Sequence, residues 1–270
     1  MNTRAVRAIV AKDLSVLRHA KAVLIPLIVV PLFMLLVLPA LAAFAPNFVN
    51  LPGAGDLDAL IQRMPPAMHE RLAPYGPDER IVVLLLTYLF APMYLILPLM
   101  VASVIAADTF AGERERRTLE ALIYTPTSDL ELLLGKLLAG FLPAMAVAWG
   151  GFFVYTVVAN LAAWPTMGRL FFPTGMWFVL AFWVAPAVAA VGLGATVIVS
   201  SKVSTFQEAY QIGGVVVLPI VLLVVGQAAG VVVLSSVFVF ALGALFWGAA
   251  AVLLAYGARS FRRGELMARA

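Results

Sequence analysis

Cysteine is absent from the 270-residue chain, and histidine occurs only as His19 and His69. Without cysteine there is no disulfide, thiolate nucleophile or cysteine metal site, and we expect the two histidines, in separate segments, to be solvated or interfacial. Charged residues are also scarce, at 12%, whereas hydrophobic residues make up 63% and the mean hydropathy is +1.02. Because soluble domains are about 45 to 50% apolar, this composition predicts an integral membrane protein.

Motifs of several function classes are missing as well. The chain has no His-Glu-x-x-His and no Gly-x-Ser-x-Gly, which argues against an intramembrane enzyme. The predicted membrane helices carry no charged coupling group at bilayer depth and show no obvious inverted repeat, which argues against an ion-driven carrier. No Gly-x-x-x-x-Gly-Lys-Ser/Thr loop occurs, so ATP binding by that motif is excluded. We expect no enzyme activity, no metal and no cofactor bound by this chain, and no nucleic-acid partner.

Long uncharged runs fill most of the chain, and each can span the hydrocarbon core of about 30 Å. The last run, 209–258, is long enough at about 1.5 Å per residue to cross twice, with its turn expected at 226–230. The sequence therefore predicts an all-α integral membrane protein, a single transmembrane domain over 1–270 with six transmembrane helices. These are expected over 22–45, 81–107, 137–168, 170–201 and, in two passes, 209–258.

Three segments outside these runs have their own patterns. Residues 1–21 combine basic residues with apolar residues at helical spacing, which predicts an amphipathic helix in the membrane surface. A secretory signal peptide is the alternative, but the next apolar run exceeds the 7 to 15 residues of a signal sequence. Residues 46–80 are rich in proline and glycine and predict an external loop, with a short helix at 56–64; residues 259–270 form a basic tail.

The distribution of positive charge predicts the orientation. All but Arg63, Arg71, Arg80 and Arg169 of the 18 Lys and Arg residues lie in the N-terminal segment, a central charged segment, the loop at 200–208 or the C-terminal tail. Because cytoplasmic loops are enriched in Lys and Arg, both termini and the central segment are expected in the cytoplasm. The loop at 200–208 is then a second possible contact with a cytoplasmic partner.

The central charged segment, 108–136, predicts an exposed elbow of two short helices. Glu113 and Arg117 stand four residues apart and can pair on a helix surface. Leu119, Leu122 and Ile123 form an apolar stripe on the opposite face, and the proline at 126 should end that helix. Ser128 and Glu131 fit a capping box that starts the next one.

The order Glu113-x-Glu115-x-x-Thr118-Leu119-Glu120-x-Leu122-x-x-x-Pro126, followed by Gly135-Lys136, resembles the cytoplasmic signature of type 2 ATP-binding cassette (ABC-2) exporter permeases. The resemblance implies a coupling helix between the second and third membrane helices that docks on a separate ABC ATPase subunit, which binds ATP and Mg. It also implies a second permease copy, identical or homologous, in a prokaryotic inner membrane. The alternative from the residues is an ordinary juxtamembrane loop of mixed charge.

Within the elbow, the resemblance implies a role for each motif residue. Docking on the ATPase is expected of Glu113, Glu115, Thr118, Leu119, Glu120, Leu122, Ile123 and Pro126. Gly135 is expected to help set the angle, and Lys136 to anchor the third helix at the lipid boundary. The alternative function is a non-transporting membrane subunit, channel or assembly factor partnered with an ATPase.

The cargo stays open among ions, drugs, peptides, lipids and polysaccharides. Polar residues within the predicted membrane helices, Gln211, Gln227 and Thr196, are candidates for the substrate pathway. They are equally candidates for hydrogen bonds between helices.

Overall fold

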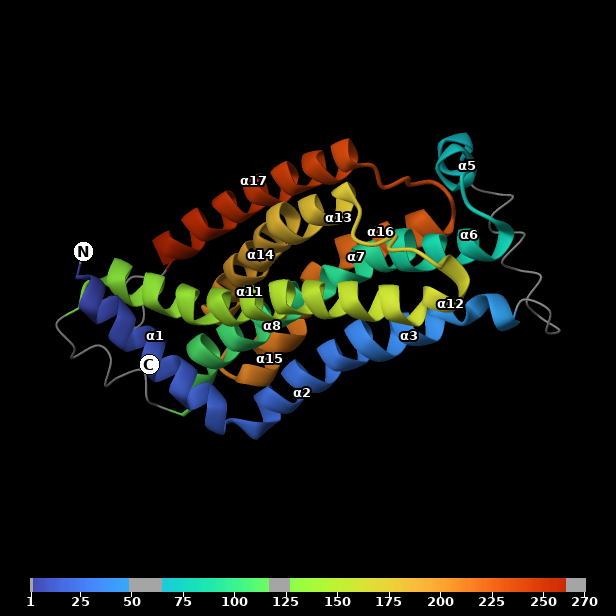
Figure 1. Ribbon diagram of the computed structural model, residues 1–270. Coiled ribbons are helices and arrows are strands. Elements are labelled where there is room, and N and C mark those ends of the chain that lie inside the picture. Colours follow the sequence, from blue (N-terminus) through green and yellow to red (C-terminus); the bar gives the residue numbers. More distant parts are fainter. Residues whose placement is uncertain (1, 49–64, 117–126, 261–270) are drawn as a thin grey trace.

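The computed structural model describes residues 2–48, 65–116 and 127–260 (Figure 1). Every regular element in these residues is a helix, and no strand occurs among them. Six of the helices are long and apolar enough to cross a membrane, which confirms the predicted all-α membrane fold. The six crossings are Val23–Ala43, Pro77–Glu115, Asp129–Ala162, Gly175–Ser200, Phe206–Ala228 and Ser236–Arg259.

Several crossings consist of consecutive helical elements. The first contains α2 (Lys21–Leu32), η1 (Phe33–Val37) and α3 (Leu38–Ala43). The second contains α6 (Pro77–Val83), η3 (Leu84–Leu89), α7 (Phe90–Tyr94), α8 (Ile96–Ala107), η4 (Asp108–Gly112) and α9 (Glu113–Glu115). The third is α11 (Asp129–Ala162), and the fourth contains α13 (Gly175–Val179), η5 (Leu180–Val184) and α14 (Ala185–Ser200). The fifth contains α15 (Phe206–Gly213), η6 (Gly214–Val217) and α16 (Leu218–Ala228), and the sixth is α17 (Ser236–Ser260).

Within the described residues, four shorter helices lie outside the crossings. They are α1 (Thr3–His19), η2 (Ala45–Phe48), α5 (Pro66–Leu72) and α12 (Trp164–Met167). Figure 1 shows α1 at one end of the bundle and α5 at the other. Helix α1 buries one face, including Val6, Ile9 and Leu17, and packs on α11. That its other face lies on lipid stays a prediction, and the short helix expected at 56–64 lies outside the described residues.

The second and fourth crossings form the centre of the bundle. In the most apolar stretch of these two crossings, 67% and 72% of the residues are buried. In the fifth and sixth crossings the corresponding shares are 17% and 22%. Helix α14 packs on both α8 and α17, and α8 also packs on α11. The outer crossings therefore keep broad apolar faces that lipid or another subunit must cover.

Four crossing segments wind as π-helix, and three of these end two or three residues before a proline. These are η1 before Pro39, η3 before Pro92 and η5 before Pro186. A proline lacks the N–H group and clashes with the carbonyl four residues earlier, so a locally wider turn relieves the conflict. Aromatic side chains supply donors for carbonyls in these wider turns: Tyr155 Oη donates to the Leu86 carbonyl at 2.6 Å, and Trp177 Nε1 to the Thr87 carbonyl at 2.7 Å.

The predicted break between the fifth and sixth crossings is confirmed, but it covers residues 229–235 and not 226–230. Helix α16 ends at Ala228 and α17 begins at Ser236, with Gly230 at a φ of +73°, where a side chain would strain the backbone. Ser235 starts α17, because its hydroxyl oxygen accepts a hydrogen bond from Phe238 N at 3.1 Å.

Candidate functional site

Helix α1 lies across the start of α11 at one end of the bundle (Figure 1). The Asn2 side chain caps α1 by accepting from Arg4 N at 3.1 Å, and the Asn2 backbone N–H donates to Glu131 Oε1 at 2.5 Å. Gly135 lies where the two helices meet, since a Cβ built on it would stand 2.8 Å from Ile9 Cγ2. The structure thus gives Gly135 a specific task, which is to let α1 pack directly on α11.

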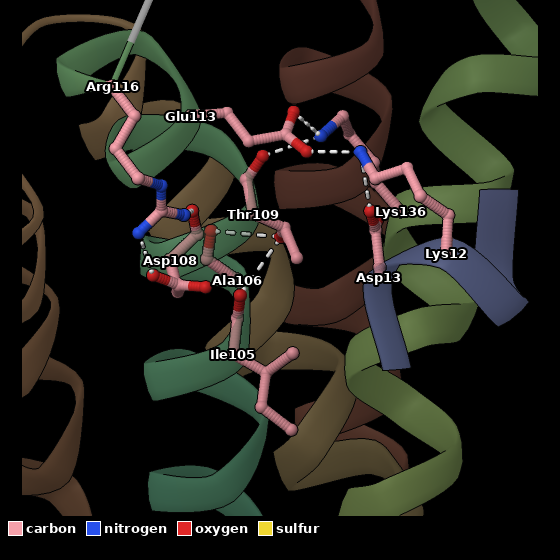
Figure 2. Close-up of polar contacts among 9 residues, drawn as sticks. All are labelled: Lys12, Asp13, Ile105, Ala106, Asp108, Thr109, Glu113, Arg116 and Lys136. Atoms are coloured by element: carbon pink, nitrogen blue, oxygen red, sulfur yellow. Dashed lines mark hydrogen bonds and ion pairs between the residues drawn. The ribbon is translucent and has the colours of Figure 1, made fainter. Parts of the chain in front are cut away.

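Four buried or half-buried charges join α1 to the end of the second crossing and the start of the third (Figure 2). Lys136 Nζ contacts Glu113 Oε2 at 2.5 Å and donates to the Thr109 carbonyl at 2.5 Å. The other Glu113 oxygen accepts a hydrogen bond from Lys12, and Lys12 Nζ also lies 2.9 Å from Asp13 Oδ1. Two cations meet two anions, so this charge cluster of Lys12, Asp13, Glu113 and Lys136 is electrically neutral.

The two members of the charge cluster on α1 have shifted pKa values. Burial raises the pKa of Asp13 above its ordinary value of 3.8, although Lys136 and Lys12 oppose the shift. For Lys12, burial acts to lower the pKa, but hydrogen bonds to Glu113 and Asp13 outweigh it and leave the pKa above 10.5. Lys12 therefore remains a cation at neutral pH and can pair with both carboxylates.

Lys136, the expected anchor of the third crossing at the lipid boundary, lies buried inside the protein. Its side chain is 0% exposed, and its ammonium faces Glu113, the Thr109 carbonyl and the Phe110 ring, whose centroid lies 5.3 Å away. A buried ammonium needs such partners, because the loss of hydration is otherwise uncompensated. Glu113 is 5% exposed and also points inward to these lysines rather than outward (Figure 2).

A local ion pair secures the last turns of the second crossing. Arg116 Nη1 reaches back to Asp108 Oδ1 at 3.0 Å, across the π-helical segment η4. Gly112 makes room for this pair, since a Cβ there would stand 2.9 Å from Asp108 Oδ1. The Thr109 hydroxyl donates to the Ile105 carbonyl at 2.9 Å. The helix that enters the elbow is thus held together up to its last described residue.

Helix α9 also contacts the loop between the fourth and fifth crossings. This is the loop at 200–208 that was named above as a second possible contact with a cytoplasmic partner. Arg114 Nη1 donates to the Val203 carbonyl at 3.0 Å. Glu115 Oε2 accepts from the backbone N–H of Phe206 at 2.9 Å, at the N-terminus of α15, where negative charge is favoured. Direct hydrogen bonds therefore connect α9, which leads into the elbow, to the loop between the fourth and fifth crossings.

The rest of the predicted docking motif cannot be placed. Residues Thr118, Leu119, Glu120, Leu122, Ile123 and Pro126 lie outside the described residues, and their roles stay predictions. Where the chain is described again, the capping box is confirmed: Glu131 N donates to Ser128 Oγ at 3.3 Å, and Ser128 N donates to Glu131 Oε2 at 3.0 Å. This box starts α11 at Asp129.

The polar candidates inside the crossings fall into two groups. Gln211 is exposed, whereas Thr196 and Gln227 are buried. Neither Thr196 Oγ1 nor the two polar atoms of the Gln227 amide has a hydrogen-bond partner within the part of the chain that the structure describes. In the same part, no group of three or more His, Asp or Glu residues is placed to hold a metal ion.

Comparison with protein families agrees with this architecture. The family model described as "ABC-2 family transporter protein" matches residues 7–246. No curated protein and no solved structure matched the chain. The family match begins within α1, includes the elbow and the charge cluster, and ends within the sixth crossing. The chain therefore belongs to the ABC-2 family of transporter proteins and is a multi-pass permease component of an ABC transporter.

Proposed function

We propose that this chain forms the substrate pathway of an ATP-driven exporter and that a separate ABC ATPase subunit docks on its elbow. The observation that carries the proposal is the family match across an elbow with both described ends firmly braced. A docking site must transmit force, and a loosely held loop would absorb it. Here the elbow is entered through the α9 helix end and left through the capped start of α11.

The charge cluster offers a route by which ATPase movement reaches the membrane helices. Glu113 lies in the last turn of the second crossing, Lys136 lies near the start of the third, and Lys12 belongs to α1. A push on the elbow therefore acts on three helices that share buried ion pairs, and not on one helix alone. We infer that these helices move as a unit when nucleotide binding closes the ATPase pair and switches the pathway between inward and outward access.

The assembly that goes with this function has two permease copies and two ATPases in a prokaryotic inner membrane. The low burial of the fifth and sixth crossings leaves apolar faces for a second copy, identical or homologous. Both termini and the elbow lie in the cytoplasm in this proposal, because Lys and Arg gather there. ATP and Mg bind the ATPase, and this chain contributes no cofactor site.

Co-purification tests the proposal most directly. Leu122→Asp places a charge in the predicted docking stripe and should abolish recovery of an ATPase subunit that carries a phosphate-binding loop. Leu170→Asp is the matched control, since Leu170 is 76% exposed on the connection before the fourth crossing, and it should leave recovery unchanged. Equal recovery with both variants would contradict the docking role. An intact membrane protein without any nucleotide-binding partner would favour a channel or assembly factor instead.

A further inference from the structure

An apolar cavity lies near the end of the bundle that carries α5 (Figure 1). Its walls come from α5, from η3 in the second crossing and from the residues around the end of α16. Its volume is about 500 Å³, open space at its mouth included. This volume lies in the range of about 300 to 1,000 Å³ that is typical of small-molecule sites, and the mostly apolar lining suits a hydrocarbon group.

Gln227 supplies the polar side chain in the lining of this cavity. The described residues around it are otherwise Pro, Met, Leu, Ala, Gly and Val. Gln227 is only 5% exposed, and neither Nε2 nor Oε1 has a hydrogen-bond partner among the described residues. A buried amide without partners costs free energy, and such groups are rare in native proteins. A ligand that bonds to this amide removes the cost.

The walls of the cavity are held in place by hydrogen bonds. Arg71 Nη1 donates to the Leu234 carbonyl at 2.7 Å and so ties α5 to the connection after α16. The backbone N–H of Val232 folds back to the Gly226 carbonyl at 3.0 Å. In η3, which also lines the cavity, the Leu86 and Thr87 carbonyls accept hydrogen bonds from Tyr155 Oη and Trp177 Nε1. The cavity is therefore preformed, which lowers the cost of binding a ligand there.

We propose that this cavity binds an alkyl chain that carries an amide, ester or hydroxyl group, with the chain among the apolar walls and the polar group bonded to Gln227. An amide such as Gln227 can both donate and accept, so each of these groups can satisfy it. Two sources supply such a molecule, namely membrane lipid and an amphiphilic cargo. Its identity as cargo rests on the proposed export function, whereas binding itself does not.

Photolabelling of the purified full chain tests binding without any ATPase. Two probes are used: a dodecanoic amide with a diazirine on the chain, and the matching dodecane without the amide. The amide probe should label peptides that contain residues 84–89 or 232–233 about five-fold more than the alkane, as expected for one added hydrogen bond. Gln227→Leu should abolish this preference and leave alkane labelling unchanged.

Gln211→Leu is the matched control, because Gln211 is an exposed glutamine in the same crossing, and it should keep the five-fold preference. If Gln227→Leu keeps it too, the proposal is wrong. A second variant covers the case in which Gln227→Leu fails to fold. Val233→Phe narrows the cavity but retains Gln227, so labelling by both probes should fall several-fold. Undiminished labelling of this variant also overturns the proposal.

Two further experiments distinguish membrane lipid from an amphiphilic cargo as the bound molecule. Competition by a synthetic phospholipid, without ATP-dependent loss of the bound amide from the complete transporter, assigns the cavity to lipid. Loss of the bound amide on addition of ATP, with little competition by phospholipid, assigns it to cargo. Failure of labelling overturns the cavity assignment and leaves the co-purification result standing, so the two proposals fail separately.

Discussion

Replacement of Lys136 by methionine should destabilise the folded protein by about 3 kcal/mol. The Lys136 side chain is 0% exposed and its ammonium lies 2.5 Å from Glu113. Its loss leaves two carboxylates, Glu113 and Asp13, to share the single cation Lys12. Breaking a buried ion pair costs about 3 to 5 kcal/mol, because the remaining charge stays desolvated. We expect the lower end of this range, since Lys12 still pairs with Glu113 and its side chain is 39% exposed to solvent.

The double variant Lys136→Met with Glu113→Gln separates charge pairing from simple loss of contacts. It removes one cation and one anion together, so Lys12 and Asp13 remain as a neutral pair. We expect it to be about 2 kcal/mol more stable than Lys136→Met alone, because coupled neighbours do not add. Lys202→Met, at an exposed loop position, is the matched control and should change stability by no more than about 0.5 kcal/mol.

Reversible unfolding in mixed micelles with rising SDS fraction measures these differences, with the fluorescence of the five tryptophans as the signal. Two results would refute the reasoning. If Lys136→Met costs no more than Lys202→Met, the ammonium is hydrated in solution and not buried. If the double variant loses the sum of the two single losses, Lys136 and Glu113 are not coupled.

Two further predictions concern α1. Gly135→Leu should push α1 off α11, because even a Cβ at this position would stand 2.8 Å from Ile9 Cγ2; we expect a loss of about 1 to 3 kcal/mol, partly restored by Ile9→Ala, in the same unfolding assay. Because burial raises the pKa of Asp13 above 3.8, the folded state binds that proton more tightly than the unfolded state, so its contribution to stability should decline as pH rises from 3.8 through the raised pKa. Asp13→Asn should remove this part of the pH dependence, and an unchanged pH profile would contradict the assignment.

The six crossings could be predicted because each follows from an uncharged run that is long and apolar enough to span the bilayer. The ends of the second and third crossings could not be predicted, because a charged residue marks the end of a crossing only where no partner inside the protein neutralises it. In the structure the second crossing continues to Glu115 and the third begins at Asp129. Glu113 and Lys136 neutralise each other inside the protein, so neither has to leave the helix for water. Each of these charges has its partner far away in the sequence, so a local sequence pattern cannot reveal the pair.

Candidate site residues were predictable only where the interaction is local. Ser128 and Glu131 stand three residues apart, and their capping box forms as expected. Lys12 and Glu113 are 101 residues apart, and no pattern in the sequence links them. Glu115 belongs to the predicted docking motif, and among the described residues its carboxylate accepts a hydrogen bond at the start of α15. For these residues, tertiary packing decides the role.

The charge cluster is costly in a way that bears on its purpose. Apolar residues of similar volume in place of a buried ion pair often leave stability unchanged or raise it, so stability alone does not account for the cluster. What ion pairs add is a preferred relative position, because Lys136 contacts both Glu113 and the Thr109 carbonyl and so favours the alignment of α11 with the second crossing that keeps both contacts. Leucines at these positions would tolerate sliding of one helix along another. The elbow begins and ends on these two helices, so in the proposed function a fixed alignment here would let a push on the elbow move them together.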